Sequence, residues 1–478
     1  MMKNATKLSC AIILLFASTV TLDAQTYTVL TNLRRADGDN IEFGYLIQGA
    51  DGNLYGVGLY GGAPETCHHS GCGTIFKVTR AGELTVLHEF RVSDGSFPTS
   101  LVLGTDENFY GTTSQGGMHY DGTLFRLGSD GTFTTLFNFD RGSGSIIYGT
   151  LIQGLDGDLY GTAVDKGANK NGTIFRGSPN TQRGRVLHNF DASDGSAPWA
   201  GLTLATDGNF YGTTPWGGVI SDNCPESPPP GCGTIFKITS DGAFTTLYEF
   251  DGSDGANPFS ALMQAANGNF YGTTTQGEAG DKYGSVFKMT PAGILTTLHN
   301  FDGPDGSGPW GAIIQATDGN LYGTTMDGGS NYTYGGTVFK IDSQDNVSTI
   351  YSFCFQVNCT DGAGPMVSLL QATDGKFYGT TRGGGTHDNG VVFSLDLGLK
   401  PFVAFVGAFG RPGQMRGILG QGLTGTTSVS FNGTPANFTV VSDTLIHATV
   451  PAGATTGNVT ISAPSGVLTS NVPFHVLH

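Results

Sequence analysis

A short pattern of residues recurs seven times along this chain, and it limits the choice of fold more than any other feature. In its fullest form it reads Asp-Gly-Asn-Phe-Tyr-Gly-Thr-Thr, followed in most copies by a Gly-Thr-x-Phe segment and then by a Leu-x-x-Phe segment. The Tyr-Gly steps fall at Tyr55, Tyr110, Tyr160, Tyr211, Tyr271, Tyr322 and Tyr378. A period of about 50 to 60 residues is typical of solenoids, propellers and other repeat arrays.

Each repeat contains four strand-sized segments, which we name A to D in chain order. The Asp-Gly-Asn turn between A and B favours a tight hairpin, so these segments pair as antiparallel strands. In segment B an apolar residue stands next to the tyrosine, so apolar groups point to both faces of the sheet. Sheets stacked as blades around an axis cover both faces. The alternative is an open β-solenoid, for which this period is long.

The ends of the repeat region predict a closed ring. After Val391–Ser394 the seventh repeat runs into Pro401 without a segment D. A matching segment stands at the other end of the chain, over Tyr27–Leu33. An N-terminal strand that completes the last blade removes the exposed sheet edges. We therefore predict an all-β chain with a seven-bladed β-propeller over residues 25–398, closed by this N-terminal strand.

Residues 401–478 have a different pattern, with short alternating strands and turn signals that suit a small β-sandwich. Gln421-Gly-Leu, the stretch Ser428–Ala436, Ile446–Pro451 and Thr456-Gly457 resemble the immunoglobulin-like IPT/TIG domain. The resemblance covers nearly all of this segment. It implies an Ig-like sandwich used for adhesion, spacing or surface display, and it brings no catalytic residues.

The repeats over residues 27–398 resemble the GloVer-containing tandem-repeat proteins of bacteria, through Tyr-Gly-Thr-Thr, Gly-Gly and Gly-Thr-x-Phe-Lys. Two departures are Val57 in place of the first threonine and Gly390-Val-Val-Phe393 in place of Gly-Thr-x-Phe. The resemblance implies an exported protein, often tethered to the cell surface, without an assigned reaction. It leaves open whether this chain is secreted or attached to the surface.

The N-terminal residues read as an export signal. Lys3 and Lys7 precede an apolar run over Leu8–Val20, and Ala24 suits a signal peptidase. We expect residues 1–24 to be removed, with an uncleaved anchor as the alternative, and no membrane span in the mature chain. The net charge of −16 at pH 7, without a basic run, argues against a nucleic-acid partner.

Six cysteines of the mature chain form three local pairs, which in an exported protein predict disulfides that stiffen single loops. The pairs are Cys67 with Cys72, Cys224 with Cys232, and Cys354 with Cys359. The alternative for the first pair is a zinc site with His68 and His69. The other two pairs have no histidine between them, so disulfides explain all three pairs more simply.

The connections between B and C and between D and A should emerge on one face of the ring, and they include the longest insertions and all three cysteine pairs. Exposed aromatic side chains there suit stacking on sugar rings or gripping an extended peptide. The candidate ligand-binding residues are His119, Tyr120, Trp199, Trp216, Trp310, Tyr332, Tyr334 and His387. For the three tryptophans the alternative is packing between blades.

Two further sets of residues recur in the repeats. One is a carboxylate before glycine, at Asp94, Asp194, Asp254, Asp305 and Asp361. These residues suit turns, with calcium binding as the alternative, and we predict no other cofactor or metal. The other set is His88, His188 and His299 in segment D, where Phe137 and Tyr248 also occur. A position that takes His, Phe or Tyr predicts packing.

No catalytic motif is present, and the sequence does not pair Glu65, Asp222 or Glu226 with a second carboxylate. The main hypothesis is therefore a non-catalytic exported propeller that binds an extracellular glycan or a surface protein, with carbohydrate preferred. The first alternative is a secreted hydrolase or lyase that acts on polysaccharide or a small secreted compound. The second is structural display.

Overall fold

The computed structural model describes residues 25–38, 45–62, 67, 71–224, 229–277, 282–329 and 335–477. Within these ranges the chain is all-β, as predicted, apart from a 3-10 turn, η2 (Val357–Cys359). The predicted export signal, residues 1–24, lies outside the described residues. A search of the described helical segments finds none that is long and apolar enough to cross a membrane.

The described part of the repeat region forms seven four-stranded sheets. In six of them the strands follow one another in chain order, as segments A to D predict. The first three sheets are β2 (Ile47–Gln48), β3 (Leu54–Gly58), β4 (Thr74–Val78) and β5 (Leu84–Glu89); β6 (Ser96–Leu103), β7 (Phe109–Gln115), β8 (Thr123–Leu127) and β9 (Phe133–Asn138); and β10 (Ile152–Gln153), β11 (Leu159–Ala163), β12 (Thr173–Ser178) and β13 (Arg183–Asn189). The next three are β14 (Thr203–Leu204), β15 (Phe210–Thr214), β16 (Thr234–Ile238) and β17 (Phe244–Glu249); β18 (Met263–Gln264), β19 (Phe270–Thr274), β20 (Ser285–Met289) and β21 (Leu295–Asn300); and β22 (Ile314–Gln315), β23 (Leu321–Thr325), β24 (Thr337–Ile341) and β25 (Val347–Ser352).

The seventh sheet takes its fourth strand from the N-terminus. Its order is β1-β28-β27-β26, and β1 pairs antiparallel with β28. The strands are β1 (Thr26–Asn32), β26 (Leu370–Gln371), β27 (Phe377–Thr380) and β28 (Val391–Asp396). The ring of Tyr27 stacks on that of Tyr351 at 4.2 Å, and its hydroxyl donates to the carbonyl of Asp361. The segment predicted over Tyr27–Leu33 thus supplies the missing strand.

The tyrosine of the repeated pattern holds the turn between A and B. In six described repeats its hydroxyl donates to the aspartate of that turn, with distances of 2.6 to 3.0 Å. The pairs are Tyr55 and Asp51, Tyr110 and Asp106, Tyr160 and Asp156, Tyr211 and Asp207, Tyr322 and Asp318, and Tyr378 and Asp374. Burial and the neighbouring carboxylate raise the pKa of each tyrosine. In the fifth repeat Asn267 donates to Tyr271 instead.

Two other repeated side chains connect neighbouring sheets. The first threonine of the pattern donates to a carbonyl of the next repeat, as from Thr162 to Ala200 at 2.8 Å. A glutamine of segment A accepts the backbone N–H of the preceding turn, as Gln153 does from Thr105 at 2.9 Å. The same contact joins the seventh repeat to the first, because Gln48 accepts from the N–H of Thr373 at 2.9 Å.

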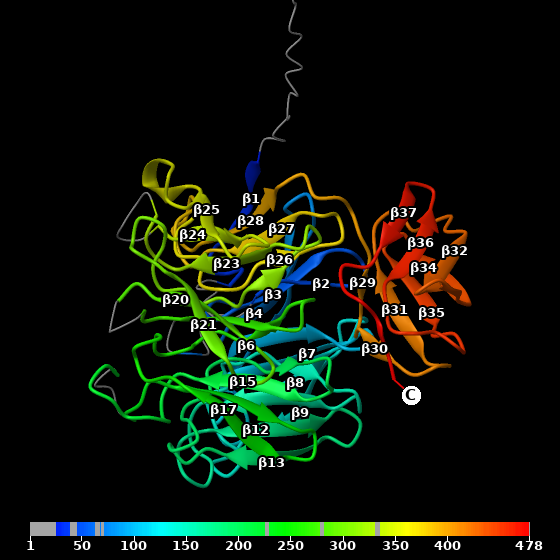
Figure 1. Cartoon of the computed structure of the whole chain (residues 1–478). Coiled ribbons are helices and arrows are strands. Elements are labelled where there is room, and N and C mark those ends of the chain that lie inside the picture. Colours follow the sequence, from blue (N-terminus) through cyan, green and yellow to red (C-terminus); the bar gives the residue numbers. More distant parts are fainter. Residues whose placement is uncertain are drawn as a thin grey trace, which may run out of the picture.

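Apolar clusters lie between neighbouring sheets, and each contains residues of two successive repeats. One further cluster joins the first sheet, through Leu54 and Phe76, to the seventh, through Tyr378 and Val392. Both faces of each sheet are therefore covered, as the neighbouring apolar residue and tyrosine of segment B predict. Together these contacts give a propeller-like arrangement (Figure 1).

The C-terminal part is a sandwich of two four-stranded sheets with a short parallel pair. Phe431, Ile446, Ile461 and Phe474 are fully buried between the sheets. The strands are β29 (Ala404–Phe405), β31 (Met415–Leu419), β35 (Leu445–Thr449) and β34 (Phe438–Ser442); β33 (Thr434–Pro435), β32 (Ser428–Phe431), β36 (Val459–Ala463) and β37 (Gly466–Thr469); and β30 (Phe409–Gly410) with β38 (His475–Val476).

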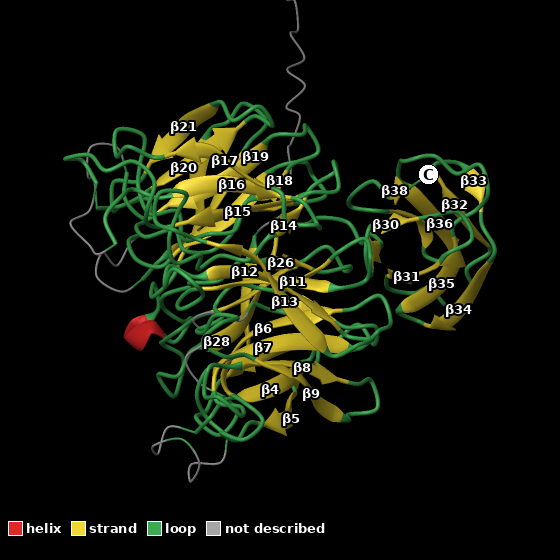
Figure 2. Cartoon of the chain, turned by 90° about the horizontal axis from the view of Figure 1, so that it is seen from below, coloured by secondary structure: helices red, strands yellow, loops and turns green. Residues whose placement is uncertain are grey.

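The sandwich packs against the face of the repeat region that carries the A–B turns. Thr444 donates to the carbonyl of Ala50 at 2.7 Å, Gln421 donates to the hydroxyl of Thr373 at 3.1 Å, and His447 pairs with Glu107. Figure 2 shows η2, which belongs to a D–A connection, on the side away from the sandwich. The D–A loops and the sandwich thus lie on different faces.

The pairing of β1 with β28 predicts a large effect of one substitution. Tyr27→Ala removes the ring that stacks on Tyr351 and Phe393, so we expect the free energy of unfolding to fall by about 2 to 4 kcal/mol. Thr28→Ala, at an exposed position of the same strand, should change it by less than about 0.5 kcal/mol. Urea unfolding followed by fluorescence measures both variants, and equal stability of the two would contradict the role of β1.

A second prediction concerns acid stability. Burial raises the pKa of Asp207, but hydrogen bonds from Lys237, Asn209 and Tyr211 outweigh it and lower this pKa to about 2. Such a carboxylate stabilises the fold above its unfolded pKa of about 3.9, and the contribution disappears as the pH falls toward 2. Asp207→Asn should therefore lower the melting temperature at pH 7, and the difference from wild type should shrink between pH 4 and pH 2. A difference that does not depend on pH would contradict this account.

Candidate functional site

The B–C and D–A loops lie side by side on one face, as predicted. Isolated bridges join the two kinds of loop in five described repeats. The bridged pairs are Ser145 and Asp165, Ser196 and Trp216, Ala256 and Gln276, Ser307 and Asp327, and Ala363 and Gly383. Binding residues often lie on loops that a rigid scaffold positions, so this face is the first place to look for a site.

All three predicted disulfides are present: Cys67–Cys72, Cys224–Cys232 and Cys354–Cys359. The sulfurs of Cys67 and Cys72 bond to each other, so neither is a thiolate ligand as the zinc alternative requires. His68 and His69 lie outside the described residues. Among the described residues, no group of three or more His, Cys, Asp or Glu side chains could hold a metal ion.

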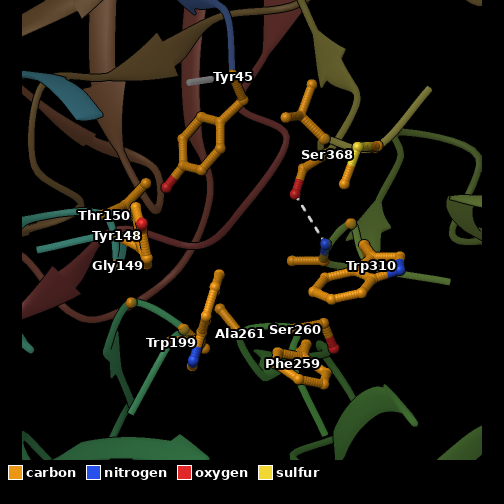
Figure 3. A pocket seen from close by; sticks show the side chains of 16 residues that line it. Tyr45, Tyr148, Gly149, Thr150, Trp199, Phe259, Ser260, Ala261, Trp310 and Ser368 are labelled. Atoms are coloured by element: carbon orange, nitrogen blue, oxygen red, sulfur yellow. Dashed lines mark hydrogen bonds between the residues drawn. The ribbon is translucent and has the colours of Figure 1, made fainter. Parts of the chain in front are cut away.

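A central pocket of about 80 Å³ is lined by equivalent residues of successive repeats (Figure 3). These residues stand at the end of five D–A loops, shortly before segment A, and four are half-buried while Met366 is buried. They are Tyr148, Trp199, Phe259, Trp310 and Met366. Because the inner strands of neighbouring sheets converge, one position per repeat builds a continuous wall.

The aromatic rings of this wall contact one another. Trp199 stacks on Tyr148 with centroids 4.5 Å apart, and Phe259 lies 4.3 Å from Trp310. Trp199 and Phe259 meet edge to face at 5.5 Å, a favourable geometry for aromatic pairs. Trp216 joins the cluster from a B–C loop, 5.4 Å from Phe259. The cluster holds the rings in place, so the pocket is formed before a ligand arrives.

Tyr45 occupies the far side of the central pocket. The equivalent position of the other described repeats holds a small residue, namely Ser100, Thr150, Gly201, Ala261, Ala312 or Ser368. The Tyr45 side chain points toward Thr150 (Figure 3). Burial raises the pKa of Tyr45 to about 12, so the phenol stays neutral at physiological pH.

The polar part of the central pocket is uncharged. Its described lining holds Thr150, Ser260 and Ser368, and the Ser368 hydroxyl accepts the N–H of Ala312 at 2.8 Å. No Asp, Glu, His, Cys, Lys or Arg belongs to the described lining. The pocket thus offers aromatic faces, hydroxyl groups and backbone, an arrangement suited to binding a neutral polar ring.

The structure brings together three of the predicted binding residues and separates the others. Trp199 and Trp310 line the pocket and Trp216 supports it, whereas His119 and Tyr120 are exposed in a B–C loop, Tyr120 by 71%. His387 lies in a separate open depression with Asp327, Arg382 and Asp388. Tyr332 and Tyr334 lie outside the described residues.

The large pocket side chains that were not predicted from the sequence are Tyr45, Tyr148, Phe259 and Met366. For three of them a signal was available, because they take the place of Trp199 and Trp310 in other repeats. The packing alternative for the two tryptophans holds in part, since their rings contact aromatic neighbours while also lining the pocket.

The carboxylates before glycine act in turns and bond to strand D. Asp194 accepts the N–H of Asp191 at 3.0 Å and lies 2.7 Å from Nε2 of His188. His299 meets Asp305 at 2.6 Å in the same way. The other loop carboxylates each contact a strand D side chain in the same way: Asp254 contacts Tyr248, Asp361 contacts Tyr351, and Asp94 contacts His88. These contacts occupy oxygens that a calcium site would need.

In the second repeat the strand D residue and the loop carboxylate are both replaced. There strand D holds Phe137, which has no hydrogen-bonding group, and Ser143 replaces the carboxylate of the loop. His188 also stacks on Phe244 at 3.9 Å, so the packing role predicted for these histidines is combined with a hydrogen bond to a loop carboxylate. The histidines and carboxylates are therefore part of the scaffold.

The contact between His188 and Asp194 predicts that substitutions of the two residues have non-additive effects on the free energy of unfolding. Asp194→Ser should destabilise the wild-type protein by about 1 to 3 kcal/mol, because His188 loses a charged partner. In the His188→Phe background the same change should cost about 1 kcal/mol less, as in a natural repeat. A double-mutant cycle by urea unfolding measures the coupling, with and without a calcium chelator. Additive effects, or a loss of stability with the chelator alone, would contradict the pairing.

Comparisons with known proteins agree with this architecture. The Gloeobacter/Verrucomicrobia repeat model matches residues 16–224 and 225–441, and the IPT/TIG domain model matches residues 407–476. A sequence search of curated proteins finds no significant match.

Two of the similar solved structures are enzymes. An inactive variant of virginiamycin B lyase from Staphylococcus aureus, solved with quinupristin, has a TM-score of 0.50 and 15% identity over 78% of this chain and 99% of its own. A fungal alcohol oxidase in complex with copper has a TM-score of 0.52 and 12% identity over 94% of this chain and 99% of its own. At such low identity the similarity shows the fold alone.

Proposed function

This chain belongs to the Gloeobacter/Verrucomicrobia repeat family, and we propose that it is a closed seven-bladed propeller that binds carbohydrate in its central pocket. The contact between Gln48 and Thr373 supports closure, because it repeats between the last and first sheets a contact found between other neighbours. The apolar cluster between the same two sheets supports it too.

The observation that favours carbohydrate as the ligand is the uncharged aromatic wall of the central pocket. A sugar ring has apolar C–H faces that stack on aromatic rings and hydroxyl groups that need hydrogen-bond partners. Trp199, Phe259 and Trp310 offer the faces, and the hydroxyl of Thr150 lies in the same lining. A small pocket of this kind suits one ring of a longer glycan.

The alternative is a secreted hydrolase or lyase. General acid–base chemistry needs groups that titrate near the working pH beside the reacting bond. In the described pocket lining, only the phenols of Tyr45 and Tyr148 titrate. A binding function therefore fits this pocket better, although the enzymes with similar folds keep the alternative worth testing.

The setting of the site fits an exported protein. Disulfides persist in oxidising compartments, and three such bonds stiffen loops of this chain. The Ig-like sandwich lies on the face away from the D–A loops, so it leaves the central pocket open. As a spacer or adhesion module it would hold the protein while the pocket faces a surface glycan or glycoprotein.

The test is a glycan-binding screen with the mature chain, residues 25–478, read by tryptophan fluorescence. Trp310→Ala and Trp199→Ala should each weaken binding at least about tenfold, because each removes an aromatic face from the pocket. Tyr120→Ala, at an exposed position away from the pocket, should leave the affinity unchanged.

Release of product in the same wells would favour the alternative, a hydrolase or lyase, over a binding function. Binding to no glycan, or binding that Tyr120→Ala abolishes and Trp310→Ala does not, would overturn the proposal.

A further inference from the structure

A second cavity, of about 610 Å³, lies between the repeat region and the sandwich. It shares Tyr45, Thr150 and Ser368 with the lining of the central pocket, so the two spaces meet at this constriction. Tyr45 is the one large side chain at its position among the described repeats. The second cavity thus adjoins the proposed carbohydrate site at this constriction and opens beside the sandwich.

Apolar side chains from both domains line this cavity. The repeat region contributes half-buried residues of the inner strands, namely Ile47, Leu204, Met263, Ile314 and Leu370. The sandwich contributes Phe409, Val472 and Pro473. No Asp, Glu, Lys or Arg belongs to the described lining. A charged ligand would lose its hydration here without gaining a partner.

Two repeats replace the glutamine of segment A by leucine. Where Gln153, Gln264 and Gln315 each reach back to a neighbouring turn, the second and fourth repeats have Leu103 and Leu204, and Leu204 lines this cavity. Leu204 adds aliphatic surface to this cavity and to an adjoining hollow, and Phe409 of the sandwich lines both spaces.

The polar side chains of the cavity come from both the repeat region and the sandwich. The amides of Gln264 and Gln315 already bond to backbone groups. The side chains of Asn471 and His475 have no hydrogen-bond partner among the described residues, and His475 stacks on Phe409 at 4.9 Å. Burial lowers the pKa of His475, so its imidazole is neutral at physiological pH.

We propose that this cavity binds a small uncharged molecule with an apolar body and one hydroxyl or carbonyl group. Its volume lies within the range of about 300 to 1,000 Å³ that is usual for small-molecule sites. The apolar body would fill the space between the inner strands and Val472, and the polar group would bond to Asn471 or His475. The sandwich then forms one wall of a binding site.

The test uses the mature chain and the uncharged dye N-phenyl-naphthylamine, whose fluorescence rises in apolar surroundings. We expect saturable binding with one dye per chain. Val472→Arg, which brings a charge to the apolar wall, should weaken binding at least about tenfold. Val467→Arg is the matched control, because Val467 lies on the same sandwich, 71% exposed and outside the cavity lining.

Two further measurements test where the dye binds and whether the cavity prefers an uncharged ligand. Met263→Trp fills the cavity from the repeat region and should also weaken dye binding, while Trp216→Ala, on the other face, should not. Decanol should displace the dye at lower concentration than decanoate, because no cation lines the cavity. No saturable dye binding, equal binding by the two valine variants, or stronger displacement by decanoate would overturn the proposal. These outcomes do not depend on whether glycans bind the central pocket.

Discussion

The two apolar faces of each sheet are the constraint on which the rest of this structure depends. A sheet with one neighbour would leave the rings and aliphatic side chains of its other face in water, at a cost of about 1.5 to 3 kcal/mol for each fully exposed residue. The seventh sheet meets this demand by packing against the first, where Phe76 lies in one cluster with Tyr378. Strand β1 covers the remaining edge of that sheet.

The repeated residues are used by the scaffold, so function must be sought in the departures from the repeat. The tyrosine holds the A–B turn, the threonine and glutamine join neighbouring sheets, and the loop carboxylates bond to strand D. The departures are the aromatic residues of the D–A loops, Tyr45 and Leu204. They lie at the centre, where a single substitution changes the wall of a pocket while the contacts between sheets persist.

The sequence predicted the features that depend on neighbours along the chain. The strand order, the role of Tyr27–Leu33, the disulfides and the shared face of the B–C and D–A loops all follow from period and spacing. It did not predict that Tyr148 and Phe259 meet Trp199, because that depends on how closely the inner strands converge. The position of the sandwich was also missed, since it depends on complementary surfaces far apart in the chain.

The central claim is that Trp199 and Trp310 form a ligand-binding wall. The chain has three tryptophans, so their side-chain N–H signals can be followed singly by NMR in a ¹⁵N-labelled mature chain during titration with oligosaccharides. The account predicts saturable shifts of the Trp199 and Trp310 signals, with a smaller shift for Trp216. Shifts confined to signals outside the central pocket, with all three indoles unchanged, would contradict it.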